Sequence, residues 1–304
     1  MCICPSNFLI HLLIYTFGYW ILDIIIYTQF MEADKFRNYD NATPRVVEHY
    51  LNMRSKQTIA HYDKMAAKYT FNDPNKRMTI LDAFHKLESY VDASDPDLEI
   101  PNLFHLLQTA EGIRNAGHPE WFQLVGLLHD VGKIMFLWGT DEDGQNGYDH
   151  RGQQWSLGGD TFVCGCAIPE QIVFPEFNKL NTDMSNELYN TKYGIYYPHC
   201  GLDTLKFSWG HDEYMYRMLV ANKALIPYEG LAMIRYHSAY SWHTYNAYEH
   251  LCNEKDALTK EWVKKFNVFD LYTKSSDNKI DIDKVWPYYE ALLNKYGLGG
   301  QLWW

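Results

Sequence analysis

Residues 126–133 (GLLHDVGK) place a histidine and an aspartate side by side at the end of an apolar run, with a lysine four residues after the histidine. The apolar run predicts that His129 and Asp130 lie against a core, where an unpaired charge is costly. A bound metal cation compensates for both side chains at once. A buried ion pair or a helix-end contact is the alternative, and for an isolated His-Asp pair it is the commoner explanation.

Four more histidines and aspartates stand beside large apolar residues in other segments, namely His105, His211, His237 and Asp270. Each one alone is more often a hydrogen-bonded core residue than a metal ligand, and the second pair, His211-Asp212, shows that the dipeptide is a weak signal. Together the six residues offer four imidazoles and two carboxylates, a set that suits iron, zinc or manganese. Because six ligands exceed what one metal takes while it holds substrate, two metals that share a carboxylate fit the count better.

The elements that must position these residues are helices almost throughout. Apolar spacing and turn signals predict helices over residues 44–65, 79–91, 101–115, 119–139, 209–223, 227–240, 262–272 and 288–296. Residues 141–154 (DEDGQNGYDHRGQQ) predict a mobile surface insertion, and residues 155–198 predict loops with at most a short hairpin. The sequence therefore favours a mostly α, single-domain helical bundle with loop-rich insertions over residues 31–304.

Composition excludes some partners and favours one compartment. The chain has 304 residues, of which 47% are hydrophobic and 16% aromatic, so a sizeable core is expected. The net charge of −11 argues against nucleic acid, which needs a basic face. The six cysteines form neither a CxxC zinc pattern nor a disulfide framework, so we expect reduced thiols in a cytoplasmic protein.

Residues 8–30 form an almost wholly apolar segment that is long enough to span a bilayer. Neither lysine nor arginine precedes it, so the charged start of a signal peptide is missing. Three interpretations stand: translation begins at Met31, the segment is an anchor, or it is a helix that packs on the domain. The first is favoured, and residues 1–30 are treated as an anchor or an upstream extension outside the fold.

The order of the six residues, H…HD…H…H…D, resembles the HD-domain superfamily, whose core is H…HD…D on a helical bundle. Longer words, from about Phe36 to the C-terminal tryptophans, are similar to the myo-inositol oxygenase family. They are FRNY (36–39), VDASDPD (91–97), His105 followed by QTAEGIR (108–114), VGLLHD (125–130), GDTF (159–162), PHCGL (198–202), SWGHDEY (208–214) and FDLYTK (269–274).

The resemblance implies an enzyme that cleaves the ring of myo-inositol with O2 at a mixed-valent di-iron centre and gives D-glucuronate and water. It assigns the first iron to His105, His129, Asp130 and Asp270. It assigns the second to His211, His237 and the shared carboxylate of Asp130, with positions left open for adjacent inositol hydroxyls. Coordination lowers the pKa of an oxygen ligand, so a bound alkoxide is expected at neutral pH.

Lys133 follows His129 by four residues and is expected on nearly the same helix face, where its ammonium holds a substrate oxygen and shuttles a proton. The resemblance implies a polar cage, because each buried hydroxyl must be matched. Its substrate contacts are Arg37, Asp92, Asp95, Lys133, Gly159, Asp160, His211, His237, Ser238 and Lys274. The structural alternatives are a surface ion pair for the arginine, turn capping for Asp92 and Asp95, a tight turn for the glycine and a solvated helix face for Lys133.

Two other functions stay open at this stage. An HD-domain phosphohydrolase would act on a phosphate ester and would want several basic residues, for which the chain offers mainly Arg37, Lys133 and Lys274. A non-catalytic metal-binding protein is the third. The insertion at 141–154 precedes Gly159 and is expected to alter a lid over the site. The expected partners are myo-inositol and dioxygen alone, with the catalytic domain a monomer away from membranes.

Overall fold

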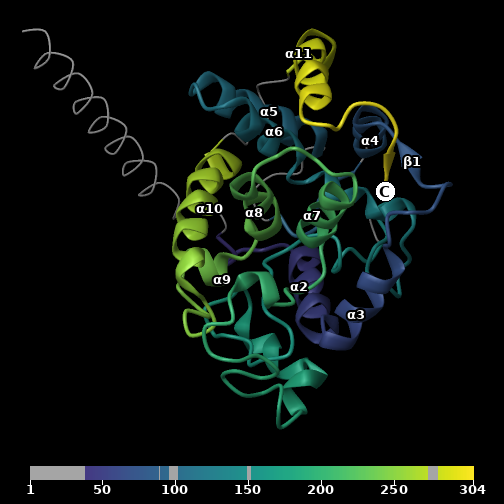
Figure 1. Cartoon of the computed structure of the whole chain (residues 1–304). Coiled ribbons are helices and arrows are strands. Elements are labelled where there is room, and N and C mark those ends of the chain that lie inside the picture. Colours follow the sequence, from purple (N-terminus) through teal and green to yellow (C-terminus); the bar gives the residue numbers. More distant parts are fainter. Residues whose placement is uncertain (1–37, 89, 96–101, 149–151, 273–279) are drawn as a thin grey trace, which may run out of the picture.

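The computed structural model describes residues 38–88, 90–95, 102–148, 152–272 and 280–304. Helices dominate these ranges, which confirms the mostly α prediction (Figure 1). The α-helices are α2 (Pro44–Lys56), α3 (Ile59–Lys68), α4 (Ile80–Leu87), α5 (Asn102–Asn115), α6 (Glu120–Leu128), α7 (His211–Ala221), α8 (Tyr228–Tyr236), α9 (Tyr240–His243), α10 (Glu254–Tyr272) and α11 (Ile282–Lys295). The 3-10 helices are η1 (Val131–Leu137), η2 (Pro175–Leu180), η3 (Thr182–Ser185) and η4 (Leu202–Thr204), and two short strands are β1 (Arg77–Met78) and β2 (Leu302–Trp303).

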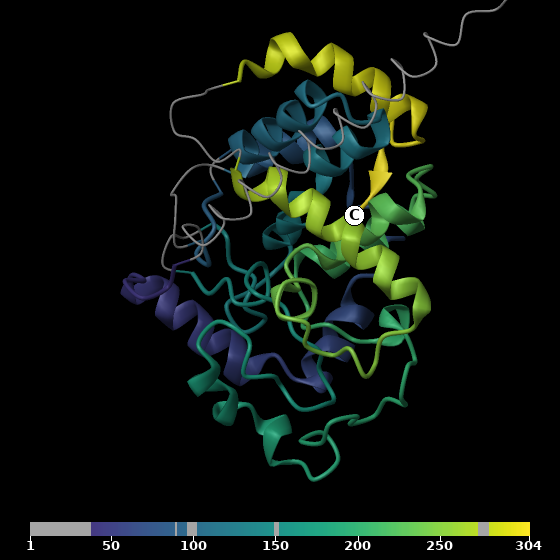
Figure 2. The ribbon, with the colours of Figure 1, turned by 90° about the vertical axis from the view of Figure 1, so that its left-hand side faces the viewer.

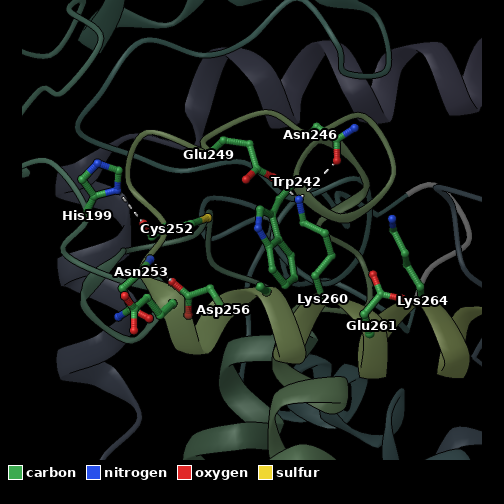
Figure 3. Close-up of a pocket in the computed structure, with 12 residues that line it drawn as sticks. His199, Trp242, Asn246, Glu249, Cys252, Asn253, Asp256, Lys260, Glu261 and Lys264 are labelled. Atoms are coloured by element: carbon green, nitrogen blue, oxygen red, sulfur yellow. Dashed lines mark hydrogen bonds and ion pairs between the residues drawn. The ribbon is translucent and has the colours of Figure 1, made fainter.

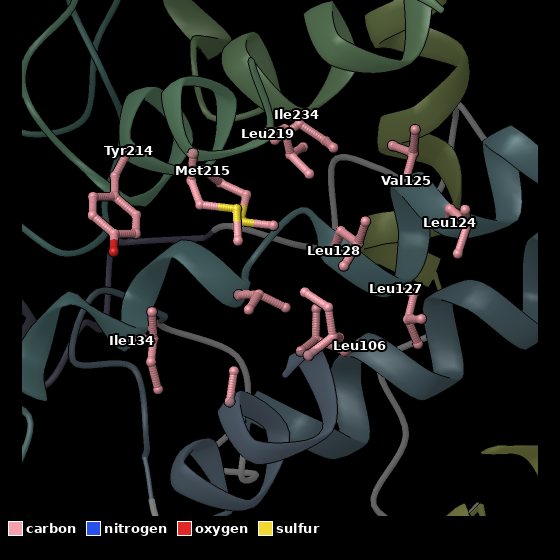
Figure 4. Close-up of a cluster of buried hydrophobic side chains, with 14 of the residues drawn as sticks. Leu106, Leu124, Val125, Leu127, Leu128, Ile134, Tyr214, Met215, Leu219 and Ile234 are labelled. Carbon is pink, nitrogen blue, oxygen red and sulfur yellow. The ribbon is translucent and has the colours of Figure 1, made fainter. Parts of the chain in front are cut away.

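Two groups of helices enclose the main apolar core. Helices α5 and α6 pack side by side beneath α11, and α8 lies between α7 and α10 (Figures 1 and 2). Leu106, Leu128, Ile134, Met215 and Ile234 bring α5, α6, η1, α7 and α8 into one buried cluster (Figure 4). Burial of each such side chain contributes about 1.5–3 kcal/mol to the stability of the fold. The core therefore holds the ends of these helices in fixed positions.

Two glycines permit the closest approaches between these helices. A Cβ on Gly126 of α6 would lie 2.8 Å from the Ile113 side chain and 3.0 Å from the Ala110 Cα on α5. A Cβ on Gly132 of η1 would lie 2.2 Å from the carbonyl oxygen of His211 at the start of α7. Side chains at these two positions would push α6 from α5 and η1 from α7.

The predicted helix over 44–65 is two helices. Thr58 interrupts it, because its side chain accepts the His61 amide and starts α3 as an N-cap. Gln57, at the junction, donates to the Trp209 carbonyl at 2.7 Å and accepts the Trp209 amide at 3.0 Å. The break therefore ties α2 and α3 to the segment that leads into α7.

The predicted continuous helix over 119–139 is also wrong. α6 ends at Leu128, and η1 begins at Val131 after the two residues of the His-Asp pair. In a 3-10 helix, side chains three residues apart lie on the same side. Lys133 consequently lies on the side of Asp130, three residues earlier, rather than being positioned by a continuous α-helix from His129.

Other predicted boundaries shift because tertiary contacts and caps override local patterns. The helix predicted over 79–91 ends at Leu87, the one over 209–223 spans His211–Ala221, and the one over 227–240 ends at Tyr236 before the separate turn α9. α10 begins at Glu254 rather than 262, and α11 begins at Ile282 rather than 288. α11 retains Pro287 in its interior, which is why a start after that proline was predicted.

The segment at 141–154 is not a purely exposed insertion. Asp143 and Gln145 are buried, and both make contacts with α3 and the residue after it. Lys64 and Lys68 donate to Asp143 at 2.6 and 2.7 Å, and the Tyr69 hydroxyl donates to Gln145 at 2.6 Å. Polar side chains can be buried when they are hydrogen-bonded, as Asp143 and Gln145 are here. The prediction of a surface segment from its polar composition was therefore wrong for these residues.

The two strands lie outside residues 155–198, the region for which the sequence predicts at most a short hairpin. β1 pairs antiparallel with β2, and Trp304 beside it is buried with its indole N–H donating to the Met78 carbonyl. Residues 155–198 hold 3-10 turns and one isolated bridge, from Val163 to Phe207. Among the helices in the described ranges, none has the length and apolar character needed to cross a bilayer; residues 1–30 lie outside those ranges.

Candidate metal centre

The structure brings the six predicted ligands together, and it does so at helix ends. His105 lies in the first turn of α5, and Asp270 lies near the end of α10. The pair His129-Asp130 falls between α6 and η1, while His211 opens α7 and His237 follows α8. All six residues are buried, at 0–7% exposed. Five helices that are distant in sequence thus contribute to one cluster.

One group of ligand atoms gathers around Asp270. The Nε2 atom of His105 lies 2.9 Å from Asp270 Oδ1 and 3.2 Å from His129 Nε2. Asp270 Oδ1 lies 3.3 Å from His129 Nε2. Asp130 presents Oδ2 to this group, at 3.9 Å from His105 and 3.7 Å from His129.

The other group gathers around the second oxygen of the same aspartate. Asp130 Oδ1 lies 3.0 Å from His211 Nε2 and 3.7 Å from His237 Nε2. The two imidazole Nε2 atoms are 3.1 Å apart. One carboxylate therefore faces two sets of donors with its two oxygens, and each set includes three groups able to hold a metal.

Backbone carbonyls fix the orientation of three imidazoles. The Nδ1 atoms of His129, His211 and His237 lie 2.9, 2.7 and 2.9 Å from the carbonyl oxygens of Gly126, Leu157 and Ile234. A carbonyl only accepts, so Nδ1 carries the hydrogen in each neutral ring and Nε2 presents its lone pair. The lone pairs of His211 and His237 therefore point toward each other, which is unfavourable unless a cation lies between them.

The residues present fit two metal ions. Ligand atoms that share one ion at about 2.1 Å lie about 3.0–3.4 Å apart. The imidazole nitrogens and Asp270 Oδ1 lie 2.9–3.3 Å apart within their groups, and the Asp130 oxygens lie 3.0–3.9 Å from the imidazoles they face. Around the cluster, the structure describes three buried carboxylates (Asp130, Asp212 and Asp270) and the partly buried Asp92, against the one ammonium of Lys133, which pairs with Asp92 and Asp130. Bound cations would offset this excess of negative charge. Four imidazoles with carboxylates and no thiolate suit iron or manganese as well as zinc.

Lys133 is buried and fully engaged. Its ammonium donates to Asp92 Oδ2 at 2.6 Å, to Asp130 Oδ2 at 2.7 Å and to Asn102 Oδ1 at 3.3 Å. Burial alone would lower the pKa of Lys133, but Asp130 and Asp92 raise it well above its usual value. The side chain is thus held as an ammonium whose three donors are in use, and the solvated-face alternative is wrong.

The segment of Asp92 reaches this lysine from the other side. Asp92 Oδ1 accepts the backbone amide and hydroxyl of Ser94, and Oδ2 accepts from Lys133. Burial raises the pKa of Asp92, but the ammonium of Lys133 and the hydrogen bonds from Ser94 lower it by more. The pKa of Asp92 therefore lies well below its usual range. Asp95 is partly buried in the same segment. A Cβ on Gly158 would lie 3.0 Å from Asp92, so the turn that contains Gly159, with a φ of +113°, lies beside this carboxylate.

The remaining predicted substrate contacts differ in their placement. Ser238 follows His237, and its hydroxyl donates to Asp212 at 2.9 Å. Asp160 accepts from Arg54 through its backbone carbonyl and from the Val173 amide through its carboxylate, which ties it to α2 and the following loops. Arg37 and Lys274 lie outside the described residues.

Sequence reasoning missed several residues that support the cluster. Asn102 accepts from Lys133, and Asp212 lies 3.0 Å from His237 Nδ1. His243 and Asn267 lie 3.0 and 3.1 Å from the His237 carbonyl oxygen through their side-chain nitrogens. The repeated His-Asp pair was a signal for Asp212. Asn102 and Asn267 carry no local signal, because their partners lie about thirty residues away along the chain.

A separate cavity of 870 Å³ lies beside α9 and the first half of α10 (Figure 3). It is lined by His199, Trp242, Asn246, Glu249, Cys252, Asn253, Glu254, Asp256, Ala257, Lys260, Glu261 and Lys264. Lys260 pairs there with Glu249 and Asn246. None of the six clustered ligands lines it, so the cavity is distinct from the candidate metal centre.

Comparison with known proteins agrees with the cluster. The family model of myo-inositol oxygenase matches residues 43–304. The chain belongs to the myo-inositol oxygenase family. It is 45% identical over 279 residues to the inositol oxygenase of Danio rerio, covering 90% of this chain and 95% of that one. It is 44% identical over 273 residues to the Homo sapiens inositol oxygenase (88% and 90% covered) and 42% over 269 residues to that of Dictyostelium discoideum (87% and 88%).

The residues matched by the family model include all those of the two metal groups. It supports an oxygenase rather than the phosphohydrolase alternative, and an enzyme rather than a non-catalytic metal-binding protein. The apolar segment at 8–30 and Arg37 lie before the matched residues.

Proposed function

We propose that this protein is an inositol oxygenase that converts myo-inositol and O2 to D-glucuronate and water at a two-iron centre. The atoms balance, because C6H12O6 and O2 give C6H10O7 and H2O, with four electrons passing from the opened ring to dioxygen. The observation that carries the proposal is Asp130, whose two oxygens face two separate sets of imidazoles.

The two ions would be held as follows: His105, His129, Asp130 and Asp270 hold the first, and His211, His237 and Asp130 hold the second. When bound, iron supplies electrons to dioxygen and lowers the pKa of a substrate hydroxyl. The second set has fewer protein ligands, and this leaves room for substrate oxygens. The ligands are buried next to the apolar core of α5–α8, and low exposure to water strengthens each charge interaction among them.

The chain's own residues bind and orient the polyol. Lys133 and Asp92 form an adjacent donor and acceptor at the edge of the Asp130 carboxylate. For Lys133 to donate to a substrate oxygen it must release one partner, and the 3.3 Å contact with Asn102 is the longest of its three. We propose that the substrate displaces Asn102, after which the ammonium holds the oxygen and moves a proton.

The other predicted contacts stay proposals of the same kind. Asp95, Gly159 and Ser238 lie in segments that border the cluster, and Arg37 and Lys274 are proposed from the family resemblance. For Asp160, the contacts with Arg54 and Val173 favour a structural role. We further propose an HD-domain helical arrangement, a monomeric catalytic domain over 31–304 and a cytoplasmic location.

The test is aerobic incubation of the iron-loaded protein with myo-inositol, following oxygen uptake, glucuronate by mass and iron per chain. We expect two irons per chain and one glucuronate for each O2 consumed. Hydrolysis of a phosphate ester with neither oxygen uptake nor glucuronate would instead favour the HD-domain phosphohydrolase.

A further inference from the structure

Asp212 is a buried carboxylate at the second set of ligands, and it belongs to neither metal group. Its Oδ1 atom lies 3.0 Å from His237 Nδ1, accepts the Ser238 hydroxyl at 2.9 Å and lies 3.4 Å from His211 Nε2. Its Oδ2 atom is buried with no hydrogen-bond partner in the described part of the chain. A buried carboxylate with an oxygen left unpaired is costly, so its presence needs a compensating role.

The contact with His237 distinguishes this imidazole from its neighbours. For His129 and His211, a backbone carbonyl lies at hydrogen-bond distance from Nδ1. The Nδ1 atom of His237 has the Ile234 carbonyl as its hydrogen-bond acceptor at 2.9 Å, and a carboxylate oxygen of Asp212 lies 3.0 Å from the same nitrogen. A carboxylate that accepts the outer N–H of an imidazole fixes the ring and makes the other nitrogen a stronger metal ligand.

We infer that Asp212 is a positioning residue that holds His237 for the second metal ion. Its carboxylate lies against the Nδ1 side of His237, where its charge attracts the N–H and favours an Nε2 lone pair that is free to bind the ion, while the Ser238 hydroxyl fixes the carboxylate. The inference rests on the two-metal centre proposed above. Its charge is the feature that matters, because an amide of the same shape accepts the same hydrogen bonds through its oxygen.

The isosteric variant Asp212→Asn separates charge from shape. Metal-free wild type and variant are titrated with Fe2+ under anaerobic conditions, and with Co2+, whose visible absorption reports the ligand set. Wild type is expected to bind two ions. The variant is expected to bind one ion normally and the other about 10–100-fold more weakly, with the Co2+ spectrum of that ion altered.

Asp256→Asn is the matched control. Asp256 is equally buried and accepts backbone amides from Leu202 and Asn253 at the start of α10, so its loss tests a structural effect alone. Both ions should bind it with wild-type affinity. In a double-mutant cycle, the dissociation constant of the ion is compared with and without Asp212→Asn in a protein that already carries His237→Ala. Asp212→Asn should then change that constant by less than a factor of about three, because the imidazole that it positions is gone.

Wild-type affinity and an unchanged Co2+ spectrum in Asp212→Asn would overturn the inference. Should Asp212→Asn not fold, Ser238→Ala replaces it: loss of the hydroxyl that fixes the carboxylate is expected to weaken one ion several-fold, and unchanged binding would again overturn it. A wild-type protein that binds a single ion contradicts the two-metal proposal, whereas a variant indistinguishable from wild type contradicts only the role of Asp212.

Discussion

At the scale of single residues, the chemistry depends on charges that are buried together. Asp130 is the centre of this arrangement: burial raises its pKa, but Lys133, His129 and His211 together lower it well below its usual value. The carboxylate is therefore an anion that faces two sets of imidazoles. Its removal leaves Lys133 paired with Asp92 and removes the one group shared by both sets.

Asp130→Ala is expected to bind one ion or none, because both sets lose an oxygen ligand. Iron per folded chain, measured after gel filtration, checks this. Asp143→Ala removes a carboxylate that contacts Lys64 and Lys68 away from the cluster and should keep two ions. Full iron content in Asp130→Ala would contradict the bridging role.

Lys133→Met keeps the length of the side chain and removes the ammonium. Turnover of myo-inositol should fall by about 10²–10⁴-fold, since a group that transfers a proton contributes that range. Iron content should hold, because Lys133 is not a ligand. Lys206→Met, which removes a surface ion pair with Asp63, is the control. Equal loss of activity and of iron in Lys133→Met would indicate a structural role only.

At the scale of elements, the site exists because helix ends meet. Each ligand lies at or near a terminus, so a small displacement of one helix separates donors that must lie about 3 Å apart. The contact between η1 and the start of α7 is the tightest of those described above: the Gly132 position leaves no space before the His211 carbonyl. This contact holds η1, which carries Lys133 and follows Asp130, against His211 of the second set of ligands.

Gly132→Ala should lower the free energy of unfolding by about 1–3 kcal/mol, because the added methyl group meets backbone rather than a flexible side chain. Urea unfolding of the metal-free protein measures this. Gly210→Ala is the comparison variant, since a Cβ there meets nothing closer than 3.6 Å; its stability should fall less than that of Gly132→Ala, by the N-cap preference of α7 alone. Equal stability of Gly132→Ala and wild type would show that the contact is not tight.

At the scale of the whole molecule, ions held by the proposed ligands would connect parts of the chain from α5 to α10. Since the ligands converge only in the folded state, binding should stabilise that state by linkage, by about 2.7 kcal/mol when the free ion is at 100 times its dissociation constant. Removing iron with a chelator should therefore lower the unfolding temperature, and adding Fe2+ back should restore it. A midpoint independent of iron would contradict a site built from these helices.

Acid stability of the whole protein should depend on histidines away from the metal centre. Burial, the largest effect, lowers the pKa of His49 from 6.5 to about 4, and its ring is hydrogen-bonded to the Gly158 carbonyl. The unfolded chain then binds more protons than the folded chain between these values, so stability falls as the pH drops from about 6.5 to 4, by on the order of 3 kcal/mol for this one group.

His49→Gln cannot be protonated and keeps an N–H donor for Gly158. Its free energy of unfolding should fall less steeply than that of wild type over the same window, measured by urea unfolding of the metal-free proteins at pH 7 and pH 4.5. Parallel slopes for the two proteins would contradict the lowered pKa.

The sequence by itself determined the composition of the cluster and the helical class. Periodic apolar residues fixed most helices, and His105, His129, Asp130, His211 and Asp270 could be selected because each stands beside apolar neighbours in a helical segment. These are local signals. Family words such as VGLLHD and SWGHDEY added the expected chemistry, since long identical words seldom arise by chance.

Only the tertiary structure decided which oxygen of Asp130 faces which imidazoles, that Lys133 reaches Asp92 and Asn102, and that Asp212 lies 3.0 Å from His237 Nδ1. It also decided the break at Thr58, the 3-10 helix after the His-Asp pair and the burial of Asp143. The physical reason is common to all: each depends on a partner far along the chain, and hydrophobic spacing records which face is buried but not what lies against it.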